Sequence, residues 1–80
     1  MSAISTYTAR HRSAIDELLE CYVCWREACQ AVSGAYEQWT DSDRGERALA
    51  YAAYLAALDG EERAAGTYAH HTARVARFAT

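Results

Sequence analysis

A seven-residue repeat runs through the first half of this 80-residue chain. The repeated positions form two series, one being Ile4, His11, Leu18, Trp25, Val32 and Trp39, the other Thr8, Ile15, Tyr22, Cys29 and Tyr36. Alternating steps of four and three place both series on one side of an α-helix. Because the repeat never changes phase, it predicts one long helix from about residue 5 to about residue 39, with Gly34 inside it.

A short polar stretch, residues 40–43, follows the repeat. Asp43, with Glu46 three residues later, has the spacing of a capping box at the start of a helix. The remaining sequence, about 44–79, has no proline and is rich in alanine, which favours helix. Two helices of similar length with a short connection predict an antiparallel helical hairpin, all-α, in a single domain spanning residues 1–80.

The second helix contains one ambiguous point. Asp59, Gly60 and Glu62 have the order and spacing of a cap signal. Two alternatives follow, a break into two helices at Gly60 or one continuous or kinked helix. We favour the continuous or kinked helix, because supercoiling absorbs the drift of about 20° per heptad in the apolar positions.

The stretch from Tyr51 to Leu58 is apolar or small at every position. A helix that is apolar all round is covered on more than one side, which a single hairpin partner cannot do. A chain this short also has a thin core of its own. We therefore predict self-association into a four-helix bundle, as a homodimer or a higher oligomer. The predicted oligomer interface consists of Leu19, Val23, Tyr51, Tyr54, Leu55 and Leu58.

The three cysteines, Cys21, Cys24 and Cys29, lie within one helical segment. An odd number of cysteines does not indicate a disulfide framework. Zinc ribbons and thioredoxin-like sites place Cys-x-x-Cys at a turn or after a strand, whereas here the pair lies in mid-helix. We predict packing roles, with Cys29 on the core stripe, and no cofactor. Metal binding and redox chemistry are the alternatives.

The histidines suggest a different site. If the hairpin turns near Asp41, residues whose numbers add to about 82 lie level, and His11 then faces His71. Two imidazoles could bind a metal ion or respond to pH. The alternative is that both histidines are polar residues at the edge of the core.

The charges are unevenly distributed. All 11 acidic residues lie between Asp16 and Glu62, so the two ends of the chain carry arginine without acid. Hairpin closure brings these ends together and predicts a contact for an anion or an acidic protein partner at Arg10, Arg12, Arg74 and Arg77. A solvated charged end is the alternative. The net charge of −3 argues against a nucleic-acid partner.

Function is the least constrained property. No segment approaches the ~20 apolar residues of a membrane span, and no apolar signal-peptide core is present, so we expect no membrane partner and a cytoplasmic protein. Phosphate-binding loops and metalloenzyme motifs are absent, and we expect no enzymatic activity. The sequence favours a small interaction or regulatory protein. The alternatives are a metal- or pH-responsive protein and a bundle that binds a ligand among its aromatic residues.

Overall fold

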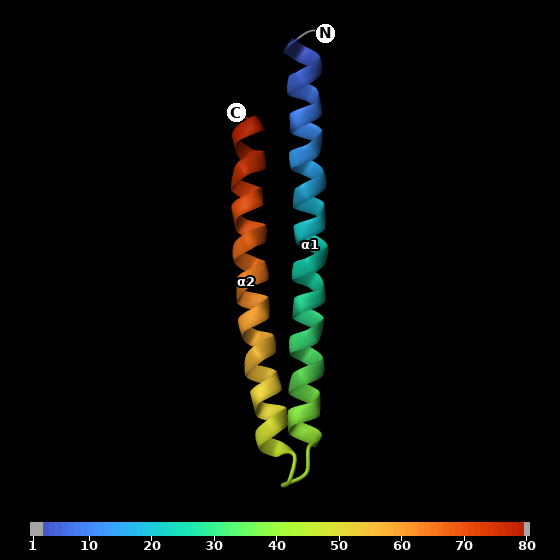
Figure 1. Ribbon diagram of the computed structural model, residues 1–80, viewed down its shortest axis with the longest axis vertical. Coiled ribbons are helices and arrows are strands. Elements are labelled where there is room, and N and C mark those ends of the chain that lie inside the picture. The colour runs from blue at the N-terminus through green and yellow to red at the C-terminus, as the bar shows by residue number, and fades with distance from the viewer. Residues whose placement is uncertain (1–2, 80) are drawn as a thin grey trace.

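The computed structural model describes the backbone of residues 3–79 and the side chains of residues 12–77. The described chain forms two helices, α1 (Ala3–Asp41) and α2 (Arg47–Ala79). They lie side by side in opposite directions, joined by one turn, with both termini at the far end (Figure 1). The prediction of an all-α antiparallel hairpin is confirmed.

The second helix is continuous. α2 runs through Gly60 without a break, and none of the glycines in the described chain has a positive φ. The alternative of two helices separated at Gly60 is therefore excluded. Asp59, which suggested a cap in the sequence, instead forms an exposed ion pair with Arg63 one turn later, with 3.6 Å between their nearest atoms.

The turn lies further along the chain than predicted, at residues 42–46 instead of 40–43. The hydroxyl groups of Thr40 and Ser42 donate to the carbonyls of Glu37 and Trp39, at 3.0 and 2.6 Å, and so extend the end of α1. The predicted capping bond does form, because the Glu46 N–H donates to Asp43 Oδ1 at 3.0 Å. However, α2 begins only after that bond.

Ring contacts across the hairpin define its register. The centroids of Tyr36 and Tyr54 are 5.7 Å apart, and those of Trp39 and Tyr51 are 4.9 Å apart. In both pairs the residue numbers add to 90, so the predicted value of about 82 is wrong. The cause is the later turn, which shifts every residue of α2 relative to α1.

The two helices meet along a line that we call the seam. Its half-buried or buried side chains recur at steps of four and three, and they are Ala14, Leu18, Cys21, Trp25, Ala28, Val32, Ala35 and Trp39 on α1, and Ala50, Tyr54, Ala57, Glu61, Ala64, Tyr68, His71 and Val75 on α2. Small and large residues alternate along it. Alanine lets two helix backbones approach closely, and the large neighbours fill the space between them.

Only one of the two predicted series lies on the seam. Leu18, Trp25, Val32 and Trp39 belong to it, but their companions on α1 are the small residues, not the bulky second series. Ile15, Tyr22 and Tyr36 instead flank the seam and remain 36%, 43% and 49% exposed. The close approach of the backbones leaves no room for these larger side chains between the helices.

The hairpin has almost no enclosed core. Ala14 is the one fully buried hydrophobic residue among the described side chains. The molecule measures 65 × 17 × 13 Å, and its radius of gyration of 18.5 Å compares with about 12 Å for a compact 80-residue domain. Packing within a single chain therefore leaves most of its apolar side chains in contact with solvent.

Gly60 gives a first testable prediction. A Cβ placed there would meet no atom within 4 Å, so alanine fits without a clash. Because glycine is about 1 kcal/mol less favourable than alanine inside a helix, Gly60→Ala should raise the free energy of unfolding by roughly that amount. Urea denaturation at a fixed protein concentration measures the change. A loss of stability would mean that another molecule packs closely against Gly60.

Candidate functional site

A continuous apolar face runs along one side of the seam. It consists of Ile15, Leu19, Tyr22 and Tyr36 from α1 and Tyr51, Leu55 and Leu58 from α2, all large hydrophobic residues that stay at least 36% exposed. On α1, Tyr22 follows Ile15 by seven residues and precedes Tyr36 by fourteen, which keeps all three on one side of the helix. Tyr51 and Leu58 are related in the same way on α2.

Aromatic contacts show that the two helices present these residues on the same side. The ring of Trp39 contacts Tyr36 of its own helix at 6.1 Å and Tyr51 of α2 at 4.9 Å. Further from the turn, Tyr22 contacts both Trp25 at 6.1 Å and Tyr68 at 5.7 Å. The tyrosine rings of both helices therefore lie over one side of the seam, and the aliphatic residues of the face continue the apolar surface around them.

Of the six residues predicted to form an oligomer interface, five are exposed in the hairpin and one lies in the seam. Leu19, Val23, Tyr51, Leu55 and Leu58 all remain exposed in the hairpin, from 36% to 58%. Tyr54 is different, because its ring lies in the seam and stacks on Trp39 at 5.4 Å. Sequence reasoning missed Ile15, Tyr22 and Tyr36, which it assigned to the core of the hairpin because the apolar repeat does not reveal which of its two flanks faces the partner helix.

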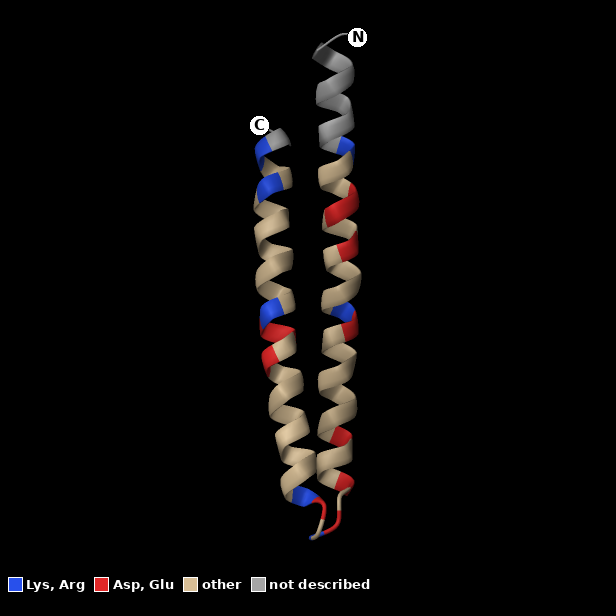
Figure 2. Ribbon diagram, viewed as in Figure 1, with Lys and Arg blue, Asp and Glu red and all other residues tan. Residues whose placement is uncertain are grey.

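The opposite side of the seam carries a polar cluster. Arg74 of α2 donates to Glu17 Oε2 of α1 at 2.9 Å, and His71 Nδ1 lies 3.7 Å from the same oxygen. Both ion-pair partners are over 40% exposed, so their attraction adds little to stability. The expectation that these basic groups lie apart from acids is wrong, because the register brings acidic segments of α1 level with the arginines of α2 (Figure 2).

This arrangement bears on the predicted anion contact. Arg74 is already engaged by Glu17, and Arg77 also makes an interaction in the structure. Arg12 is exposed, and the side chain of Arg10 lies outside the described residues. An anion or acidic partner at this end would have to compete with Glu17 for Arg74.

The predicted histidine pair is not level in the hairpin. His71 lies beside Glu17, which is six residues, or about 9 Å of helix, from His11. The side chain of His11 lies outside the described residues. His71 Nδ1 is buried and makes no hydrogen bond within the described structure. Among residues 12–77, no three histidine, cysteine or acidic side chains come together as a metal-binding group.

The cysteines are free thiols in different surroundings. Cys21 is half-buried in the seam, Cys29 is half-buried beside it, and Cys24 is exposed. The prediction placed Cys29 on the core stripe, but in the structure Cys21 lies in the seam and Cys29 lies beside it. Cys21 takes one of the small-residue positions of the seam, where a thiol serves as a small hydrophobic group.

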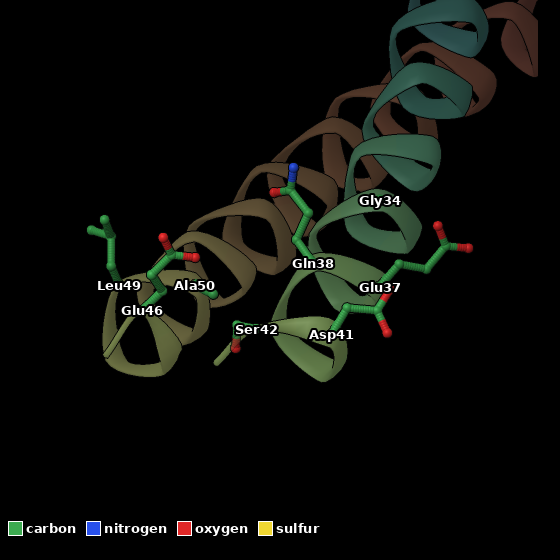
Figure 3. Close-up of a pocket in the computed structure, with 8 residues that line it drawn as sticks. All are labelled: Gly34, Glu37, Gln38, Asp41, Ser42, Glu46, Leu49 and Ala50. Carbon is green, nitrogen blue, oxygen red and sulfur yellow. The ribbon is translucent and has the colours of Figure 1, made fainter. Parts of the chain in front are cut away.

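An open depression of about 700 Å³ lies near the turn, and it is lined by Gly34, Glu37, Gln38, Asp41, Ser42, Glu46, Leu49 and Ala50. The side chains of Glu37 and Asp41 extend from α1 away from Glu46 of the turn and Leu49 of α2 (Figure 3). Because the polar groups diverge, the depression does not present a converging set of ligands.

Within the described residues, neither helix has a segment with both the length and the apolar character needed to cross a bilayer. Comparison with protein-family models, curated proteins and solved structures gave no match for this chain.

Proposed function

We propose that this chain is a non-enzymatic interaction module that works as a homodimer, with two hairpins packed through their apolar faces into a four-helix bundle. The observation that carries the proposal is the row of exposed tyrosines and leucines on one side of the seam. Exposed apolar patches of this kind are typical of protein–protein contacts.

The exposed area supports an interface of ordinary size. The accessible surface of the hairpin is 6133 Å², whereas a compact chain of 8.9 kDa exposes about 4800 Å². The excess is about 1300 Å² per chain, and a stable interface of standard size buries about 800 Å² per partner. The elongated hairpin therefore exposes more surplus surface than one partner buries in a stable dimer.

A second copy suits this face because both helices contribute to it. Its width spans α1 and α2, so another two-helix layer covers it fully, as in a four-helix bundle. On both helices an uncharged stretch lies between the turn and a band of charged residues at mid-length (Figure 2). The acidic residues of α1 lie largely off the face and would stay in solvent, where they keep the bundle soluble.

The test is the mass in solution. Light scattering at micromolar concentration should give twice the chain mass of 8.9 kDa. Because association and folding are then coupled, the thermal midpoint should rise with protein concentration.

A monomeric, fully helical chain whose midpoint does not depend on concentration would overturn the proposal. A mass of four chains would keep the interaction surface but change the assembly. Monomeric hairpins that become dimeric only at millimolar concentration would show that the face serves another partner.

A further inference from the structure

Two symmetric arrangements can bury the apolar faces of two hairpins. In the first, the twofold axis runs along the helices, so both turns lie at the same end and α1 covers α2 of the second copy. In the second, the axis crosses the helices, so the turns lie at opposite ends and α1 covers α1 of the second copy. The charges bordering the face distinguish the two.

On each helix, one charged residue near the middle of the paired length lies in the row of a face leucine. Arg26 follows Leu19 by seven residues, and Glu62 follows Leu55 by seven, so both charges border the apolar face. Both side chains are exposed. They stand on opposite edges of the hairpin, and neither forms an ion pair with another described residue.

The register places both charges at the same height. With level positions adding to 90, Arg26 is level with residue 64, only two residues, or about 3 Å of helix, from Glu62. The helices are paired from about residue 11 of α1 to its end at Asp41. Arg26 therefore lies at the middle of the paired length, and Glu62 lies beside that middle on the other helix.

This central position makes the two arrangements electrostatically opposite. With the turns at the same end, Arg26 faces Glu62 of the second copy, and symmetry repeats the pair. With the turns at opposite ends and full overlap, Arg26 faces Arg26 of the second copy, and Glu62 faces Glu62 of the second copy. Like charges held across an interface disfavour that arrangement.

We infer that the two hairpins of the dimer associate with their turns at the same end, in an orientation selected by two symmetric Arg26–Glu62 pairs between copies. This inference rests on the proposed homodimer. It identifies the second copy as the partner, and it identifies the residues that determine how that partner is oriented.

Charge reversal tests the pairing. Arg26→Glu and Glu62→Arg should each raise the dissociation constant of the dimer about tenfold, because each places two like-charge contacts in one dimer. The double reversal should restore it to within about threefold of the original. With the turns at opposite ends, each reversal turns one pair of like charges into a pair of like charges of the other sign. None of the three variants would then change the dissociation constant. That result would overturn the inference.

A distance measurement tests the orientation independently. A spin label on Arg44→Cys, at the exposed turn, is introduced after Cys21→Ala, Cys24→Ser and Cys29→Ala remove the native thiols. Turns at the same end should lie within about 30 Å of each other, given the 17 Å width of one hairpin. Opposed turns would be separated by most of the 65 Å long axis.

The outcomes separate the two proposals. A monomeric mass for the unmodified chain would rule out both the proposed dimer and its proposed orientation. A dimeric mass with a long distance between turns removes only the orientation. If the thiol-free chain does not fold, the charge reversals in the native background decide the question alone.

Discussion

Replacing Leu55 with glutamate is expected to split the dimer, raising its dissociation constant at least about 100-fold. Leu55 is 46% exposed in the hairpin, so about half of its side chain is left for the second copy to bury. The substitution removes that apolar contact and places a carboxylate in the interface, and each dimer carries the change twice. Sedimentation equilibrium over a range of concentrations measures the constant.

Leu49→Glu is the matched control. Leu49 is on the same helix and is 77% exposed, but it lines the depression near the turn on the other side of the hairpin. The same chemical change there should leave the dissociation constant within about twofold. If both variants dissociate equally, general surface hydrophobicity, not the apolar face, drives association.

Trp25→Ala should cause the largest loss of stability among substitutions in the seam, about 3 kcal/mol for each chain. The indole ring stacks on Tyr68 with a centroid distance of 5.6 Å and packs against Tyr22. Its Nε1–H also donates to Glu61 Oε1 at 3.0 Å. The alanine variant therefore removes an aromatic contact and leaves a half-buried carboxylate without its donor. Urea denaturation at a fixed concentration measures the loss.

A double-mutant cycle separates the ring from its hydrogen bond. Trp25→Phe keeps a ring but cannot donate, and it should cost about 1 kcal/mol while Glu61 is present. In a Glu61→Ala background the same change should cost less, since no acceptor remains. Equal costs in both backgrounds would show that the bond contributes nothing. Gln30→Ala, at an exposed position of α1, serves as the neutral control.

The Trp25–Glu61 pair also explains an unusual seam residue. A carboxylate among alanines would ordinarily weaken helix packing, because burying a charge without a partner is costly. The indole donor lowers that cost and links the two helices directly. A specific polar pair of this kind favours one register of the hairpin over its neighbours, since a shift by one turn would break it.

Local sequence signals were sufficient for the secondary structure. The unbroken repeat from Ile4 to Trp39 determined a long first helix, and the absence of proline with abundant alanine determined the second. Asp43 and Glu46 correctly marked the connection, because capping depends on residues three apart in the chain. These features rest on interactions between near neighbours, which a sequence displays directly.

The sequence also located most of the candidate interface. Tyr51, Leu55 and Leu58 stood out because apolar residues surrounded the helix there, and all three remain exposed in the hairpin. Leu19 of α1 was also located, whereas Val23, which was predicted with it, is exposed but does not belong to the apolar face. The tyrosines at 22 and 36 were assigned to the core, because a row beside the seam and a row within it have the same periodicity.

Only the tertiary structure decided the register and the choice of seam. Hydroxyl groups at the end of α1 delayed the turn. Because of that delay, Glu17 lies beside His71, where the predicted register placed His11. Alanines at one flank of the first series let the helices approach, so the tyrosines at the other flank were left facing outward. Both outcomes depend on how two helices fit together, through backbone distance and side-chain volume, and a periodic pattern in one helix does not contain that information.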